Sequence, residues 1–134
     1  MSRLFEKPLL RLDANGYRYF IARRPGTTEL CFGSASQDGV GYGLLGEGEG
    51  EAASAAPWDE WVVAGRLPRG ARTVEIVADG RPYRSKTRSG LWMAAVACGQ
   101  DVLGEAKFLD AAGQIVEIRD LHLGGIPRRR AVRK

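Results

Sequence analysis

The chain has 134 residues, of which 44% are hydrophobic and 27% are charged, and its formal net charge is +4. This length fits one domain of about 100–150 residues and suffices for an apolar core without disulfide or metal cross-links. No apolar run approaches the roughly 20 residues of a membrane helix, and the N-terminus lacks a signal-peptide pattern. We therefore expect a cytoplasmic protein without a membrane span.

The positive charge is concentrated at the C-terminus. The whole chain carries +4 and the five cations of residues 128–134 contribute +5, so residues 1–127 carry −1. We expect a single near-neutral domain over residues 1–127, followed by a basic tail that contains Arg128, Arg129, Arg130, Arg133 and Lys134.

Short apolar stretches separated by turn residues follow one another along the chain. Residues 8–12 and 17–23 flank an Asn15-Gly16 turn and predict a β-hairpin. Further strands are predicted, in chain order, at residues 29–35, 42–45, 61–67, 73–78, 81–88, 91–97, 104–109 and 115–121. Their lengths and their spacing of about 8–12 residues predict an all-β fold, either an immunoglobulin-like sandwich or a related antiparallel β-sandwich.

The alternation of side chains predicts which face of a strand is buried. Val74 and Ile76 are expected in the core, with the charged residue between them facing water. By the same reasoning Val116 and Ile118 point inward, and their charged neighbours point outward.

Two segments do not alternate. Residues 91–97 are apolar on both faces, which is typical of a central strand or of a strand beneath a loop; a buried helical turn is the alternative. Residues 51–56 have helical character, but Pro57 ends the segment and it is too short to be stable alone. This segment belongs to an acidic, glycine-rich loop near residues 46–60.

No group of residues has the pattern of a catalytic, cofactor-binding or metal site. Residues 41–46 match G-x-G-x-x-G, but the glycines and carboxylates that follow disfavour both a helix and a bound phosphate. The carboxylates of the acidic loop lack the spacing of a calcium site. His122 is the only histidine, and no nucleophile or ligand set accompanies it. We therefore expect no enzymatic activity, no cofactor and no metal.

The two cysteines, Cys31 and Cys98, are too few for a disulfide framework. Without an export signal, both are expected to be reduced thiols. A bridge between them is the less favoured alternative.

Residues 61–119 resemble the small immunoglobulin-like sandwich domains that are common in actinobacterial-type, and so bacterial, proteins. The resemblance rests on the stretches 65–70, 74–80, 90–93 and 109–116. It implies a sandwich fold and no particular activity. The chain departs from the antibody type, because its cysteines do not flank a tryptophan at the usual distance and Val96 stands where a tyrosine corner would fall.

The basic residues give the strongest functional signal. Arg84, Lys86 and Arg88 alternate with uncharged residues, so a strand here would present three cations on one face. The basic tail resembles arms that neutralise phosphates, and its alternative role is to aid solubility. Trp58 is a further candidate contact residue, whereas Trp61 begins an apolar strand and is expected in the core.

These observations predict a non-enzymatic protein-interaction or structural module within a larger assembly, which binds a protein partner or a second copy of itself. The alternative is an accessory protein that binds nucleic acid or another polyanion through the basic strand at 84–88 and the tail. The scarcity of aromatic residues beside that strand argues against the alternative. The candidate partner-binding residues are Arg84, Lys86, Arg88, Arg128, Arg129, Arg130, Arg133, Lys134 and Trp58.

Overall fold

The computed structural model describes residues 7–14, 16–37, 39–45, 51–55, 60–97 and 102–123. In these residues the chain forms twelve β-strands and no helix. All their pairings are antiparallel, which confirms the predicted antiparallel all-β class. Among the described residues, no helix has the length and apolar character needed to cross a membrane.

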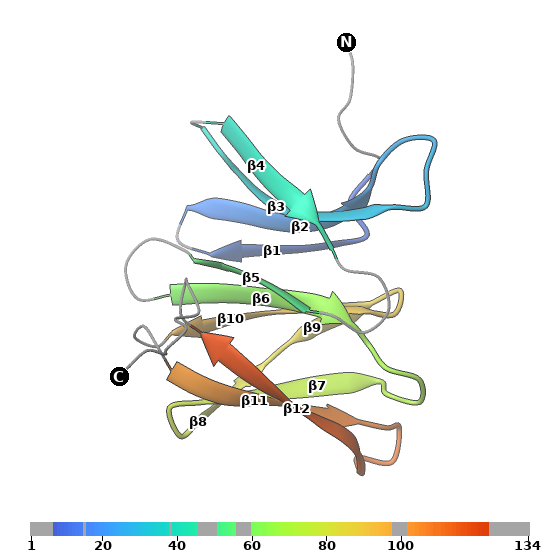
Figure 1. Ribbon diagram of the computed structural model, residues 1–134, viewed down its shortest axis with the longest axis vertical. Coiled ribbons are helices and arrows are strands. Elements are labelled where there is room, and N and C mark those ends of the chain that lie inside the picture. Colours follow the sequence, from blue (N-terminus) through green and yellow to red (C-terminus); the bar gives the residue numbers. More distant parts are fainter. Residues whose placement is uncertain are drawn as a thin grey trace, which may run out of the picture.

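The strands form three four-stranded sheets, stacked one on another (Figure 1). The N-terminal sheet has the spatial order β1 (Leu10–Ala14), β2 (Tyr17–Arg23), β3 (Leu30–Ser36) and β4 (Gly39–Leu44). The middle sheet has the order β5 (Glu51–Ala55), β6 (Glu60–Arg66), β10 (Leu91–Ala97) and β9 (Lys86–Arg88). The C-terminal sheet has the order β12 (Ile115–Leu123), β11 (Val102–Leu109), β7 (Thr73–Ala78) and β8 (Arg81–Arg84).

The middle sheet is buried on both faces, since its side chains alternate between two cores. The N-terminal core lies between the N-terminal and middle sheets and contains Leu10, Tyr19, Ile21, Leu30, Phe32, Leu45, Val62, Ala64, Leu91 and Met93. The C-terminal core lies between the middle and C-terminal sheets and contains Trp61, Val63, Ala71, Val74, Ile76, Ala78, Trp92, Ala94, Val96, Ala106, Phe108, Leu121 and Leu123. Residues 91–97 are therefore a central strand, as their two apolar faces predicted.

Two predicted elements differ from the structure. Residues 51–55, expected to have helical character, form strand β5, which pairs with β6 from Glu51 opposite Gly65 to Ala55 opposite Trp61. Pairing with β6 supplies backbone hydrogen bonds that so short a helix could not provide for itself. The predicted strand at 81–88 is interrupted at Ser85, where the chain passes from the C-terminal sheet to the middle sheet.

The predicted orientation of β12 is wrong. Val116 and Ile118 were expected in the core, but they are 44% and 50% exposed. Leu121 and Leu123 occupy the C-terminal core instead. Because side chains alternate with a period of two, burying these two leucines turns Ile118 outward. The phase of the strand is set by its C-terminal half.

A bulge at the start of β12 adds to this effect. Phe108 lies opposite Glu117, but the next residue of β11, Leu109, lies opposite Ile115. Val116 therefore has no counterpart on β11, as is usual for the extra residue of a bulge. The result is that apolar side chains at 115, 116 and 118 are all exposed.

Candidate functional site

Arg84, Lys86 and Arg88 lie where the chain leads from β8 to β9. All three are exposed, while the uncharged residues between them are half-buried, so the predicted alternation is confirmed. Two side-chain hydrogen bonds hold this segment in place. The Tyr83 hydroxyl donates to the Ala97 carbonyl at 2.7 Å, and the Ser85 hydroxyl donates to the Val74 carbonyl at 2.6 Å.

Two of these three basic side chains lie close to other groups of the protein. The ammonium group of Lys86 donates a hydrogen bond of 2.5 Å to the backbone carbonyl of Arg11 in β1 and so ties β9 to the N-terminal sheet. Arg84 lies opposite Glu75 on the outer face of the β7–β8 pair, where a carboxylate offsets its charge. Lys86 is therefore tied to the N-terminal sheet, and Arg84 faces a carboxylate residue across the β7–β8 pair, so the fold constrains two of the three cations.

Several predicted contact residues lie outside the described residues. These are Trp58 and the tail residues Arg128, Arg129, Arg130, Arg133 and Lys134, and Cys98 is outside as well. His122 lies in β12, paired with Leu103 of β11. Within the described residues, no group of three or more His, Cys, Asp or Glu side chains is placed to hold a metal ion.

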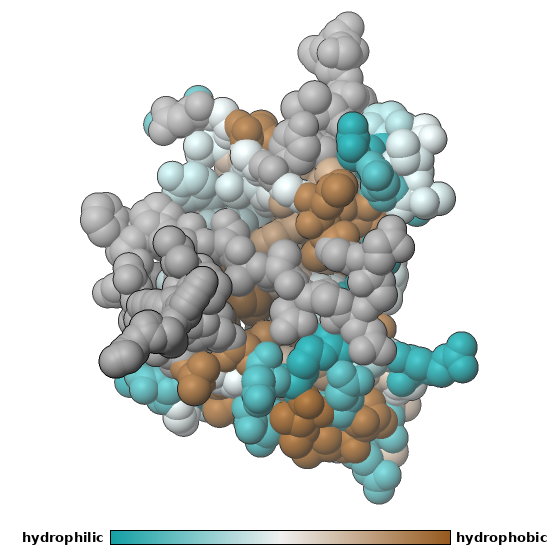
Figure 2. Space-filling model, in the orientation of Figure 1, coloured by the Kyte–Doolittle hydropathy of each residue, from teal (hydrophilic) through white to brown (hydrophobic). Residues whose placement is uncertain are grey.

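The outer face of the C-terminal sheet carries the largest group of exposed apolar side chains in the described part of the chain. Ile115, Val116 and Ile118 of β12 form this β11–β12 patch. Leu103 of β11 is 76% exposed and lies farther along the sheet, opposite His122 and beyond the Glu105–Asp120 pair. Figure 2 shows apolar surface bordered by hydrophilic surface over the region where Figure 1 places β11 and β12. An apolar area with a polar rim is the usual composition of a protein interface.

Beneath the patch, the inward face of β12 is unusual because it carries an ion pair. Arg119 Nη2 lies 2.7 Å from Glu117 Oε2, and the two side chains are only 17% and 33% exposed. The Arg119 guanidinium also lies 4.7 Å from the centre of the Phe108 ring, in a cation–π contact. The Phe108 ring and the Glu117 carboxylate together compensate the partial burial of the Arg119 guanidinium at the end of the core.

β12 is the edge strand of the C-terminal sheet, and with nine residues it is the longest of the described strands. An edge strand presents backbone N–H and C=O groups that no neighbouring strand of its own sheet uses. Among the described residues, no strand pairs with the outer edge of β12, and the β11–β12 patch adjoins this edge.

A cavity of about 630 Å³ opens between the N-terminal and middle sheets. It is lined by the loop between β2 and β3, by the end of β6 and by the Ser89-Gly90 turn between β9 and β10. These connections lie on the same side of the stack in Figure 1. Sequence reasoning missed this site because its residues come from segments far apart in the chain, with no local motif.

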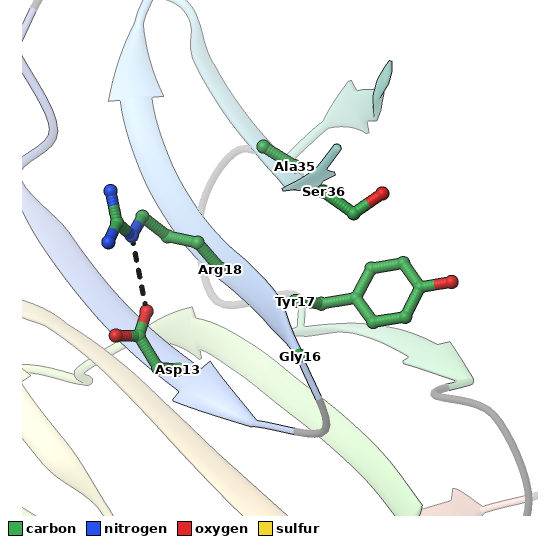
Figure 3. Close-up of a pocket in the computed structure, with 6 residues that line it drawn as sticks. All are labelled: Asp13, Gly16, Tyr17, Arg18, Ala35 and Ser36. Atoms are coloured by element: carbon green, nitrogen blue, oxygen red, sulfur yellow. Dashed lines mark hydrogen bonds and ion pairs between the residues drawn. The ribbon is translucent and has the colours of Figure 1, made fainter. Parts of the chain in front are cut away.

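A second, smaller hollow of about 450 Å³ lies at the tip of the β1–β2 hairpin (Figure 3). Its one ion pair joins Arg18 to Asp13 at 3.2 Å, and both side chains are more than half exposed. Figure 3 shows Tyr17 pointing away from this pair. The two charged residues of its described lining therefore pair with each other.

Cys31 is a free thiol, buried in β3. Burial raises the pKa of this thiol above its ordinary value; Arg24 partly opposes the increase and Glu29 adds to it. A thiol held in its protonated form is a poor nucleophile, so Cys31 acts as a small apolar residue.

No protein-family model, curated protein or solved structure matches the chain. The candidate functional surfaces of the described residues are the basic segment, the β11–β12 patch with its edge strand, and the cavity.

Proposed function

We propose that the protein is a non-enzymatic protein-interaction module, which self-associates through strand β12 as part of a larger assembly. The observation that carries this proposal is the exposure of three large apolar side chains on one edge strand, Ile115, Val116 and Ile118. Edge strands of monomeric proteins are commonly short or protected by charge. β12 has nine residues, and the charged residue on its outer face, Asp120, follows the three apolar side chains rather than separating them.

The charge pattern of β12 fits pairing of this strand with β12 of a second copy of the chain. In an antiparallel pair of β12 strands related by a two-fold axis, residues on the same face lie opposite each other. With the axis at Ile118, Glu117 of each copy lies opposite Arg119 of the other. Moving the axis to Glu117 or to Arg119 would place like charges opposite each other, which is destabilising. The axis at Ile118 is thus the favoured register, and it also brings the two Ile118 side chains together.

The first test replaces the residue at the axis. Ile118→Lys puts two ammonium groups beside each other in the paired strands, so we expect the dimer to dissociate. The matched control is Val40→Lys, since Val40 lies on edge strand β4 and is 51% exposed, against 50% for Ile118. Sedimentation equilibrium of each variant measures the outcome. A wild-type protein that stays monomeric at every concentration, or a dimer lost equally in the control, contradicts the proposal.

A second test addresses the register. Glu117→Arg places two arginines opposite each other at each cross-strand pair and should weaken the dimer. Exchanging both charges, with Glu117→Arg and Arg119→Glu together, restores opposite signs and should recover dimerisation at least in part. Thermal unfolding of the monomer separates loss of pairing from loss of the intrachain ion pair. If the double variant is as weak as the single one, the register is wrong.

For the fold, we propose an immunoglobulin-like or related sandwich made of the middle and C-terminal sheets. It is supported by the C-terminal core that these sheets share and by the resemblance of residues 61–119 to such domains. A cytoplasmic location is part of the same proposal and is supported by the free thiol of Cys31. A bacterial origin is proposed from the resemblance of residues 61–119 alone. A crystal structure tests the strand order, and thiol labelling of lysates from the source cells tests the redox state.

The alternative function is binding of nucleic acid or another polyanion through the basic segment and the tail. It is supported by the exposed positions of Arg84 and Arg88. Because Lys86 ties β9 to β1, the informative variant is Arg84→Ala with Arg88→Ala, compared with deletion of residues 128–134. Each lost phosphate contact should reduce the salt slope of duplex binding by about 0.9. Absence of DNA and RNA binding by the intact protein at about 50 mM salt excludes this alternative.

A further inference from the structure

We propose that Asp120, together with Glu105 beside it, determines the register in which two β12 strands pair. This inference rests on the proposed self-association through β12, and it adds the residue that selects one arrangement of the dimer over another. Asp120 is exposed on the outer face of β12 and lies directly opposite Glu105 of β11, which is also exposed. The strand that is proposed to pair therefore carries one of two adjacent carboxylates.

The number of paired residues does not by itself fix the register of two β12 strands. In an antiparallel pair related by a two-fold axis, the axis passes between one residue and its own copy. β12 spans Ile115–Leu123, so an axis at Ile118 pairs residues 115–121 of the two copies, and an axis at Asp120 pairs residues 117–123. These two registers are equally long. An axis at Arg119 would pair the whole strand, but it places two arginines opposite each other, which is destabilising.

The register with its axis at Asp120 places four carboxylates in one row. Glu105 lies opposite Asp120 within each chain, and this axis also places Asp120 opposite Asp120 of the second copy. Neighbouring strands are about 4.8 Å apart, so every carboxylate in the row lies beside another one. Like charges directly opposite each other destabilise a sheet, and here they meet at each of the three adjacent strand pairs.

The register with its axis at Ile118 keeps the acidic pairs of the two copies apart. Asp120 of one copy then lies opposite Val116 of the other copy. Val116 is uncharged and has no counterpart on β11, because it is the extra residue of the bulge. The outer face of β12 therefore favours the axis at Ile118.

The inner face of β12 favours the same register. The axis at Ile118 places Glu117 opposite Arg119 of the second copy, whereas the axis at Asp120 places these two residues opposite Leu123 and Leu121. Both leucines are buried in the C-terminal core, with 1% and 4% of their surfaces exposed. An apolar neighbour does not compensate a charged side chain, so the second register loses the favourable pairs as well.

The opposite edge of the C-terminal sheet, strand β8, is protected against pairing. It has only four residues, Pro82 lacks a backbone N–H, and Arg81 and Arg84 are exposed. Short length, proline and charge are the features by which edge strands commonly avoid pairing. The register of β12 therefore decides how two C-terminal sheets join.

The experiment measures the distance between spin labels at Leu103 in the dimer of the full chain, by pulsed electron paramagnetic resonance. Leu103 is 76% exposed and lies on β11, outside the pairing strands. Leu103→Cys provides the labelling position, Cys98→Ser avoids a second label, and Cys31 is buried. With strands about 4.8 Å apart and a rise of about 3.4 Å per residue, the axis at Ile118 places the labels about 30 Å apart and the axis at Asp120 about 20 Å apart.

We expect the labelled chain with its native carboxylates to give one distance, near about 30 Å. Asp120→Asn should raise the ratio of dimers at the shorter distance to those at the longer distance by about two- to fivefold, and adding Glu105→Gln should raise it further. The control, Glu75→Gln, removes a carboxylate of the same sheet that lies opposite Lys107 and Arg84 rather than opposite another carboxylate. It should leave the distance unchanged.

Salt provides a second measurement that needs no change at Asp120. At about 1 M salt the Debye length falls to about 3 Å, so the chain with native carboxylates should also gain dimers at the shorter distance. The inference is overturned if Asp120→Asn keeps the single longer distance, if Glu75→Gln changes it as much, or if the native carboxylates already give the shorter distance. The first of these results leaves self-association through β12 intact. A labelled chain without dipolar coupling at any concentration is monomeric, and that result overturns the proposed function as well.

Discussion

Gly104 occupies the closest approach between strands β11 and β7. A Cβ atom at this position would lie 2.6 Å from the backbone carbonyl oxygen of Val77 and 3.4 Å from Ala78. Backbone atoms cannot move aside as a flexible side chain can, so the strands would have to separate. We expect Gly104→Ala to lower the free energy of unfolding by about 1–3 kcal/mol, measured by urea denaturation.

The control for Gly104 is Gly41→Ala on strand β4. A Cβ atom at Gly41 meets no atom within 4 Å, and its backbone does not have the positive φ that favours glycine. Alanine there should be neutral or stabilising by up to about 1 kcal/mol, because it reduces the freedom of the unfolded chain. Equal losses in both variants would show that steric contact is not what makes Gly104 necessary.

Cys31 gives the protein a pH dependence at alkaline pH. Burial raises the pKa of this thiol above its ordinary value of 9.0, so the folded chain holds the proton more tightly than the unfolded chain. The resulting stability is complete below about pH 9 and is lost as the pH rises through the pKa of the folded state. Cys31→Ala should therefore show a smaller fall in unfolding free energy above this pH than the wild type, although it is less stable at neutral pH.

The burial of single residues was predictable where the strand has only one apolar face, because the alternation of side chains then allows only one orientation. Val74 and Ile76 are buried as expected, because each lies between polar or half-exposed neighbours in a strand with only one apolar face. The role of Gly104 was not predictable, since its cause is the approach of a strand that lies about thirty residues away in the sequence. The lining of the cavity, which includes Arg23 and Arg66, was not predictable for the same reason.

At the scale of the element, β12 shows how a correct strand can be given the wrong orientation. Residues 115–123 have apolar side chains on both possible faces, so the sequence allowed two phases. Val116 and Ile118, in the first half of the strand, favour one orientation, whereas Leu121 and Leu123, in the second half, favour the other. Only the position of the C-terminal core decides between them.

The orientation of β12 can be tested by paired truncations. Leu121 is 4% exposed, so Leu121→Ala should cost about 2–5 kcal/mol of unfolding free energy. Ile118→Ala removes a side chain that is half exposed and should cost less than about 1 kcal/mol. Both are measured by denaturant unfolding at low protein concentration, where self-association does not contribute. A larger loss at Ile118 would mean that the strand has the opposite phase.

At the scale of the whole molecule, the layer arrangement follows from one property of two strands. β6 and β10 carry apolar side chains on both faces, so each needs a sheet above and a sheet below. The sequence predicted a central strand at 91–97, but the number of layers could not be read from it. Whether β1–β4 cover that second face, or extend another sheet, depends on contacts between residues distant in the chain.

Because the middle sheet supplies one wall of each core, the two cores should unfold together. Removing the N-terminal sheet would expose Val62, Ala64, Leu91 and Met93, which are all fully or nearly fully buried. We expect Phe32→Ala, at the N-terminal core, to cost about 3–5 kcal/mol and to reduce the hydrogen-exchange protection of β7 and β11 amides as much as that of β2 and β3. Amide exchange followed by NMR measures both regions in one experiment. If protection falls only in β1–β4, the N-terminal sheet is a separate cooperative unit, and the middle sheet tolerates exposure of one apolar face. Coupled loss would instead show that burial on both faces of β6 and β10 holds the three layers in a single folded state.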